Sequence, residues 1–163
     1  MRVLGIDPGS IITGFGVVEE VQGTLHALAW GAVRAGAKQP LLGRLKRIYD
    51  GLSEALQAWN PDVVAVERVF FAENPKTALV LGHARGVALL TVANAALPLV
   101  EYTASEIKQA VVGYGRADKA QMQQMVRALL RLETIPQPAD AADALAAAIC
   151  HLHTYGVRGK AVE

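Results

Sequence analysis

The sequence predicts an α/β protein with a five-stranded mixed sheet and helices on both faces of that sheet. Three observations support this. Strand-like apolar runs come first and are joined by short turns that contain Gly, Pro or Ser. Later strand-like runs alternate with segments whose apolar residues recur at helical spacing. A hairpin-led meander followed by β–α alternation is typical of a mixed sheet covered by helices.

Three strands are expected first, over residues 2–7, 12–20 and 24–34. The first is a continuous apolar run, which is typical of a buried strand. Pro8, Gly9 and Ser10 favour a turn into the second strand. The following segment, residues 41–59, has apolar residues at helical spacing. Asn60-Pro61 ends that helix, because the residue before a proline disfavours helical backbone.

The rest of the chain alternates between strands and helices. Strands are expected over residues 62–67 and 98–102, and helices over 76–96, 104–112, 118–132 and from about Pro138 to about Tyr155. Gly113 and Gly115 separate the two short helices. Pro138 suits a first helical turn, because the N–H group that proline lacks would have no partner there. Residues 1–156 therefore form one expected domain, and residues 157–163 an expected flexible tail.

Four acidic residues lie at the ends of apolar segments: Asp7, Glu67, Asp140 and Asp143. Asp7 ends the first strand and Glu67 the fourth. If these strands are neighbours at the centre of the sheet, both carboxylates emerge at the edge where open sheets bind ligands. Asp140 and Asp143 are three residues apart in an Ala-rich helix, so they share one helix face. The last helix would bring them in from the side.

Carboxylates gathered in a dry site repel one another and favour a bound cation. Oxygen ligands without Cys or His suit Mg²⁺ or Mn²⁺, and such a site is suited to phosphoryl transfer. Each residue alone has a simpler explanation. Asp7 can open an Asp-Pro-Gly turn. Asp140 and Asp143 are expected in the first turn of a helix, where acidic residues are favoured by roughly 0.3–1 kcal/mol each. That alternative explains the whole set poorly.

The net charge of +1 argues against an indiscriminate polycation, yet the charge is uneven. Two stretches are rich in basic residues: Arg34, Lys38, Arg44, Lys46 and Arg47 in the first, and Lys108, Arg116, Lys119, Arg127 and Arg131 in the second. Basic surface around an acidic pocket is the layout of a metal-dependent nuclease, because Lys and Arg hold phosphates. Solvated helix faces explain any single one of these charges equally well.

The remaining composition suggests a globular protein of a reducing compartment. Hydrophobic residues make up 52% of the chain, which excludes a disordered protein. The single cysteine, Cys150, cannot form an internal disulfide and fits the cytoplasm. No apolar run reaches the length of a membrane span, because Asn94 and Pro98 interrupt the longest one.

Several segments, taken in order, resemble the bacterial RuvC Holliday-junction resolvases: Gly5 to Ser10, Thr13 to Gly16, Glu67 to Asn74, Leu81 to Gly86, Val111 to Gly115 and Ala139 to Ala146. Each segment alone is weak, but together they are specific and extend from residue 3 to about residue 153. The resemblance implies an RNase H-like fold, a homodimer, and Mg²⁺-dependent symmetric nicking of four-way DNA junctions in recombination and repair. It also implies 5′-phosphate ends and the RuvA–RuvB branch-migration motor as a partner.

Residue by residue, the resemblance assigns Asp7, Glu67, Asp140 and Asp143 to the catalytic, metal-binding quartet of the family. We expect two Mg²⁺ ions per subunit, about 3.5–4 Å apart, with Mn²⁺ as a substitute. The remaining assignments are DNA contacts and catalytic cations. Phe70 is expected to stack on bases at the junction centre, Lys119 and Lys108 to lie near the scissile phosphate, and Lys76 to contact the DNA backbone.

Two other functions are open at this point. YqgF-like nucleases, which process ribosomal RNA, share the fold but lack the Glu-x-Val-Phe segment and the Asp-Ala-Ala-Asp helix start. Actin-like or sugar-kinase-like nucleotide binders share a Gly-Ile-Asp-x-Gly hairpin but need a second lobe, for which 163 residues leave no room. For assembly, residues 77–90 are apolar on more than one face, and Gly82 and Gly86 permit close approach of a second copy.

Overall fold

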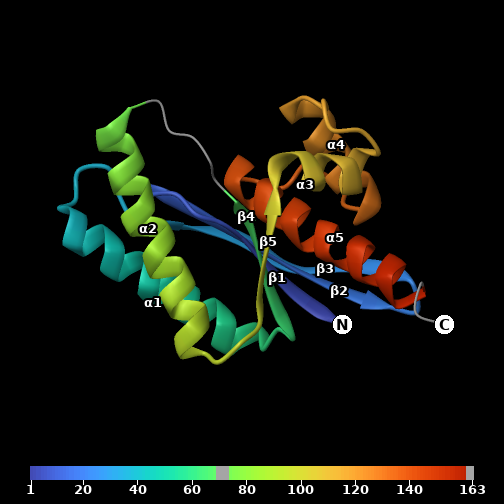
Figure 1. The fold of residues 1–163 in the computed structure, drawn as a ribbon, viewed down its shortest axis with the longest axis horizontal. Coiled ribbons are helices and arrows are strands. Elements are labelled where there is room, and N and C mark those ends of the chain that lie inside the picture. Colours follow the sequence, from blue (N-terminus) through green and yellow to red (C-terminus); the bar gives the residue numbers. More distant parts are fainter. Residues whose placement is uncertain (69–73, 161–163) are drawn as a thin grey trace.

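The computed structural model describes the backbone of residues 1–68 and 74–160, and side chains as far as Tyr155. In chain order the elements are β1 (Arg2–Asp7), β2 (Ile12–Val21), β3 (Thr24–Arg34), α1 (Leu41–Trp59), β4 (Val63–Arg68), α2 (Pro75–Asn94), β5 (Leu99–Thr103), α3 (Ala104–Val112), α4 (Lys119–Leu129) and α5 (Ala139–Lys160). Figure 1 shows their arrangement. The predicted order of strands and helices is confirmed.

The five strands form one mixed sheet in the order β3-β2-β1-β4-β5. β1 is antiparallel to β2 and parallel to β4, and β5 extends the parallel half. The first and fourth strands are therefore neighbours at the centre of the sheet, as predicted. Their carboxyl ends meet at one edge, because the two strands run in the same direction.

Helices cover both faces of the sheet. α1 and α2 pack against each other on one face, and α5 lies across the other face with α3 and α4 beside it (Figure 1). Successive residues of β1 alternate between the two cores: Val3 packs with α5, and Leu4 and Ile6 pack with α1 and α2. This alternation follows from the two-residue period of a strand. Asp7 shares the parity of Val3, so it belongs to the α5 face of the sheet.

Glycines in the sheet allow α5 to lie unusually close to it. A Cβ atom added at Gly5 would collide with the carbonyl oxygen of Ala144, and one at Gly14 with the carbonyl oxygen of Asp140. A Cβ at Gly16 would lie 2.6 Å from Cγ of Leu145. All three glycines face α5. These glycines therefore set how close α5, the helix that carries Asp140 and Asp143, lies to the sheet.

Capping side chains set the starts of three helices. Asn74 accepts a hydrogen bond from the Thr77 N–H, and Pro75 opens α2. Thr103 and Asp118 each form a reciprocal capping box, with Glu106 and Gln121 respectively. Such caps satisfy N–H groups that have no partner within the helix. As a result, α4 begins at Lys119, one residue after the expected start, because Asp118 is its cap.

Some helix ends differ from those predicted. α4 ends at Leu129, before the expected residue 132, and Arg131 just beyond it has a left-handed backbone (φ 53°) that cannot continue a helix. α5 continues to Lys160 instead of ending near Tyr155. No Pro interrupts this segment to stop the helix. Residues 161–163 lie outside the described part of the chain.

By length and composition alone, α2 could cross a membrane. Over an 18-residue stretch of this helix, the mean hydropathy is 1.2 and 22% of the stretch is buried inside the protein. The sequence prediction that no segment has this length was therefore wrong, because the Lys, His and Arg in α2 do not lower its average hydropathy enough. The fold uses α2 differently. Arg85, inside the helix, donates to the carbonyl oxygen of Glu67 and pairs with Glu101, which attaches α2 to the sheet.

Candidate active site at the carboxyl edge of the central strands

Two acidic side chains emerge where β1 and β4 end side by side. Asp7 is the last residue of β1, and Glu67 is the next to last residue of β4. The residues just before them, Ile6 and Val66, are partners in the parallel register. Both acidic residues share the parity of side chains that face α5, so the two carboxylates face the same side of the sheet.

α5 brings two further carboxylates to this edge. Gly14 is the register partner of Asp7 on β2, and the backbone of Asp140 lies directly over Gly14. Asp143 follows one turn later on the same side of α5. Only Asp140 is in the first turn of the helix, so the sequence reading that placed both residues there was wrong. The favourable interaction with the helix N-terminus is confined to that turn and does not account for Asp143.

The charges of all four carboxylates interact. Burial is the main cause that raises the pKa of Asp7 to about 7, and the charges of Asp143, Glu67 and Asp140 raise it further. Burial also raises the pKa of Glu67, again with a contribution from Asp143. The structure thus brings the four predicted acidic residues into one electrostatic site.

Two lysines complete this site. Lys119, the first residue of α4, donates a hydrogen bond to Oδ2 of Asp143 at 3.1 Å, and this bond is the main cause that raises the pKa of Lys119. Lys108 of α3 lowers the pKa of Glu67 by its charge. Both lysines line a pocket of about 190 Å³ together with Glu67, Ala104, Ile107, Met122, Asp143 and Ala146. The structure therefore places Lys108 and Lys119 beside the carboxylates, and their expected contact with the scissile phosphate stays a prediction.

The donor atoms suit a hard divalent cation. Carboxylate oxygens are the ligands that Mg²⁺ and Mn²⁺ prefer. Burial and then the charges of three neighbouring carboxylates raise the pKa of Asp7 to about 7, and a bound cation would offset both effects. In the described residues, no group of three or more His, Cys, Asp or Glu side chains is arranged so that it could hold a metal ion. Asp143 is instead paired with Lys119. The charge and chemistry of these residues suit a metal ion, but in this structure Asp143 faces the ammonium group of Lys119.

Arg85 is a site residue that sequence reasoning missed. Its Nη1 donates to the carbonyl oxygen of Glu67 at 2.6 Å, and its Nη2 pairs with Glu101 of β5. The same charge lowers the pKa of Glu67. Arg85 therefore fixes the backbone that carries one of the four carboxylates. A mostly buried arginine within an otherwise apolar helix was the available signal, because such a charge needs a partner.

Phe70 and Lys76, the two remaining predicted DNA contacts, lie in or next to a segment that the structure does not describe. Phe70 lies outside the described residues, as does its neighbour Phe71. Lys76 is exposed in the first turn of α2, close in sequence to that segment.

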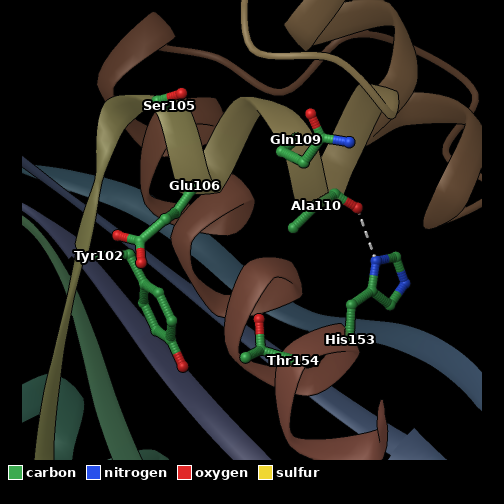
Figure 2. A pocket seen from close by; sticks show the side chains of 7 residues that line it. All are labelled: Tyr102, Ser105, Glu106, Gln109, Ala110, His153 and Thr154. Carbon is green, nitrogen blue, oxygen red and sulfur yellow. Dashed lines mark hydrogen bonds between the residues drawn. The ribbon is translucent and has the colours of Figure 1, made fainter.

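A larger cavity, of about 540 Å³, lies between α3 and α5 away from the carboxylates (Figure 2). It is lined by Tyr102, Ser105, Glu106, Gln109, Ala110, His153 and Thr154. His153 donates from Nδ1 to the carbonyl oxygen of Ala110 at 2.8 Å across this gap. That bond connects the two helices and explains the histidine without a ligand.

The comparisons with known proteins agree with one another. The family described as crossover junction endodeoxyribonuclease RuvC matches residues 3–151. A protein with that description from Syntrophotalea carbinolica is 57% identical over 155 residues, which cover 95% of this chain and 96% of the relative. The Thermus thermophilus RuvC structure superimposes with a TM-score of 0.87 at 36% identity and covers 98% of this chain and 97% of its own. The T. thermophilus RuvC in complex with Holliday junction substrate gives a TM-score of 0.88 at 32% identity, with 96% of each chain covered.

Proposed function

Because the chain belongs to the RuvC family of crossover junction endodeoxyribonucleases, we propose that Asp7, Glu67, Asp140 and Asp143 hold the metal ions with which it cuts DNA. The protein is a Holliday-junction resolvase with an RNase H-like fold. The family match over residues 3–151 favours this function over that of a YqgF-like nuclease. One observation supports the metal assignment most. Burial and, after it, the charges of three further carboxylates raise the pKa of Asp7 at the edge where the central strands end.

The metal assignment is two Mg²⁺ ions per subunit, with Mn²⁺ as a substitute. Bound divalent cations supply an activated water and stabilise the leaving 3′ oxygen, which gives 5′-phosphate ends. The chain itself supplies the charge around the reacting phosphate. Lys119 and, on the α3 side, Lys108 present ammonium groups at the pocket that Glu67 and Asp143 line. Such groups stabilise charge that develops on a phosphate.

Lys119 has two proposed partners, which are Asp143 in the free protein and a phosphate when DNA is bound. In the free protein, its ammonium group neutralises Asp143 at 3.1 Å. A cation held by Asp143 would leave the ammonium group of Lys119 available to a DNA phosphate in the same pocket. The hydrogen bond to Asp143 raises the pKa of Lys119 above its ordinary value of 10.5, at which the amine is already protonated at neutral pH. Lys119 is therefore a phosphate-binding cation held next to Asp143, a proposed metal ligand.

We also propose that the protein acts as a homodimer through α2. The helix buries Ala84, Ala88, Thr91 and Val92 against its own domain. Leu79 and Leu90, which are 64% and 55% exposed, form an apolar stripe with the uncovered Gly82 and Gly86. A second copy would cover this stripe. A two-fold dimer matches the near two-fold symmetry of a four-way junction and presents one active site to each of two opposed strands.

The remaining assignments extend from the family. The proposed partners are four-way junction DNA and the RuvA–RuvB branch-migration complex, and the proposed location is the cytoplasm. The buried thiol of Cys150, whose pKa burial raises to about 11, is consistent with a reducing compartment.

The decisive experiment offers the protein a synthetic mobile four-way junction and a linear duplex of the same sequence, with Mg²⁺. Paired nicks at symmetric positions with 5′-phosphate ends are expected on the junction only. Asp7→Asn keeps the shape of the side chain and removes a charge, so it should abolish cleavage while junction binding persists. Ca²⁺ should support binding without efficient cleavage, because the ion is larger than Mg²⁺ and its coordination geometry is less regular. Cleavage by Asp7→Asn at the wild-type rate would show that the assignment of the metal site is wrong.

A further inference from the structure

A second group of cations lies next to the carboxylate edge, on the connection between β3 and α1. No Asp or Glu occurs from Val21 to Tyr49, a segment that contains Arg34, Lys38, Arg44, Lys46 and Arg47. Lys46 is neutralised by Asp50 at 2.6 Å. The other four have no ion pair with any residue that the structure describes. A run of unneutralised cations at one edge of the sheet favours a polyanionic ligand.

Arg34 lies on the same face of the sheet as Asp7. Asp7 pairs with Gly14, and Gly14 pairs with Ala32 of β3, so these three residues form one row across the sheet. Arg34 is two residues beyond Ala32 and therefore on the same face, displaced toward the edge that carries the carboxylates. Strand spacing and rise place its Cα about 12 Å from that of Asp7. Since one strand of DNA carries a phosphate about every 3.4 Å of helix axis, this distance corresponds to a few phosphates.

Arg44 reaches the same edge from α1, on the opposite face of the sheet. Its Nη1 donates to the carbonyl oxygen of Ser10 at 3.3 Å, in the loop that follows Asp7. Its Nε is buried without a partner and cannot reach an external ligand. Apart from the bond to Ser10, the two Nη groups make no hydrogen bond with the described residues. An arginine held to the loop by one N–H group keeps further donors for an external oxygen acceptor. A planar guanidinium with free donors suits a phosphate.

The two cationic groups lie on different sides of the site. In Figure 1, the connection after β3 and the pair α3 and α4 are far apart, with the first turn of α5 between them. Lys108 and Lys119 come from α3 and α4, whereas Arg34 and Arg44 come from the β3–α1 side. The carboxylates therefore lie between two positive surfaces.

We infer that Arg34 and Arg44 bind backbone phosphates of the junction arm that leaves the active site on the β3–α1 side. This inference rests on the proposed function, because it takes four-way junction DNA as the ligand. The two residues contact DNA on the flank opposite Lys108 and Lys119, so they position the strand relative to the carboxylates. Phosphate contacts of this kind fix register and contribute no sequence preference.

The test measures the salt dependence of junction binding in Ca²⁺ for Arg34→Gln, Arg44→Gln and the matched control Lys46→Gln. Each variant removes one positive charge, but Lys46 is already paired with Asp50 on the same helix as Arg44. Between about 50 and 200 mM KCl, the plot of log K against log salt has a negative slope, whose magnitude should decrease by about 0.9 for each lost phosphate contact. The magnitude should decrease for Arg34→Gln and Arg44→Gln and stay at the wild-type value for Lys46→Gln.

Two further comparisons distinguish a phosphate contact from a structural role of these arginines. Arg44→Lys should retain the slope if the charge meets a phosphate, whereas a purely structural role at Ser10 would make it behave like Arg44→Gln. Arg34 is exposed, so Arg34→Gln decides the question if Arg44→Gln unfolds. Slopes for both arginine variants equal to that of Lys46→Gln would overturn the inference. Failure of the wild-type protein to prefer junction over duplex would instead overturn the proposed function.

Discussion

Lys119 donates a hydrogen bond to Asp143 at 3.1 Å and so connects the first residue of α4 to α5, which carries two of the carboxylates. The bond occupies an oxygen that a metal ion would use. In the proposed site, Lys119 would therefore compete with a cation for Asp143 in the free protein. It would also supply positive charge to a DNA phosphate in the pocket that both residues line.

Replacing Lys119 with Met should separate these two roles. Cleavage of a four-way junction should fall by about 10²–10³, as for loss of one donor that stabilises transition-state charge. Binding of Ca²⁺ to the DNA-free protein, measured by calorimetry, should become tighter because Asp143 is released. Lys119→Arg is the control, since it keeps the charge and the competition. Weaker Ca²⁺ binding in Lys119→Met would show that Lys119 assists the metal site instead of competing for it.

The raised pKa of Asp7 predicts how the metal-free protein responds to pH. The folded pKa of about 7 exceeds the ordinary value of 3.8, mainly because of burial. The folded state therefore binds more protons than the unfolded state between these values. The stabilisation from Asp7 is complete below about pH 4 and is lost as pH rises through 7. The free energy of unfolding in urea with EDTA should decrease across that range.

Asp7→Asn is the control for this pH dependence. Asn resembles the neutral carboxyl group, so the variant should lose the decrease and be more stable than the wild type at pH 8, by on the order of 1 kcal/mol or more. Added Mg²⁺ should restore stability to the wild type alone. A wild-type protein whose unfolding free energy rises steadily from pH 4 to 8 would contradict the origin assigned to the pKa shift.

Much of the fold was predictable because local patterns and tertiary structure agree. The buried run of β1, the turn at Pro8 and Gly9, and the stop at Asn60 each act within a few residues. Asn60 indeed has a left-handed backbone (φ 41°) at the end of α1. The end of α5 was mispredicted: the helix continues past Tyr155 to Lys160 although Gly156 and Gly159, which weaken helices, lie in that stretch.

Asp7 and Glu67 could be identified from their positions at strand ends, and Asp140 and Asp143 from their spacing on a helix, whereas the residues that hold them in place could not. The hydrogen bond from Arg85 to Glu67 joins residues 18 apart in sequence, so no local spacing reveals it. The same holds for Gly5 and Gly14, which look like ordinary strand glycines until α5 is placed over them. Sequence patterns identify the chemistry, and the long-range packing that orients it becomes visible only in the fold.

The glycine contact makes a prediction about stability. Gly5→Ala would place a methyl group against the backbone of Ala144, and neither backbone can move without disturbing the core. We expect a loss of about 1–3 kcal/mol or more in the free energy of unfolding, as for other overpacked cores. Gly43→Ala in α1 is the matched control, because its nearest neighbour is a side-chain atom of Gln39 at 3.9 Å. That variant should gain about 0.5–1 kcal/mol from helix propensity. Equal stabilities of the two variants would contradict the close packing of α5.

The proposed dimer makes a prediction about assembly. Leu90→Asp should convert a dimer into a monomer at micromolar concentration, because a buried unpaired carboxylate in an apolar interface is costly. Leu42→Asp is the control, since Leu42 is 82% exposed but lies on α1, away from the proposed interface. Sedimentation velocity distinguishes the two. A Leu90→Asp protein that remains dimeric, or a wild type that is monomeric and still cuts junctions symmetrically, would remove α2 from the interface.

Phe70 and Phe71 should have opposite roles, although both lie outside the described residues. Adjacent residues of an extended segment point in opposite directions, so one ring is expected to pack inward and the other to be free to meet an unpaired base. Base–aromatic stacking contributes roughly 1–3 kcal/mol per base, which is enough to stabilise an opened junction centre. Phe70→Ala should therefore leave the melting temperature nearly unchanged and reduce junction cleavage about 5- to 150-fold, while Phe70→Trp retains activity. Phe71→Ala should mainly lower the melting temperature. The reverse pattern, with Phe70→Ala unfolding the domain and Phe71→Ala inactive at unchanged stability, would assign the stacking role to Phe71.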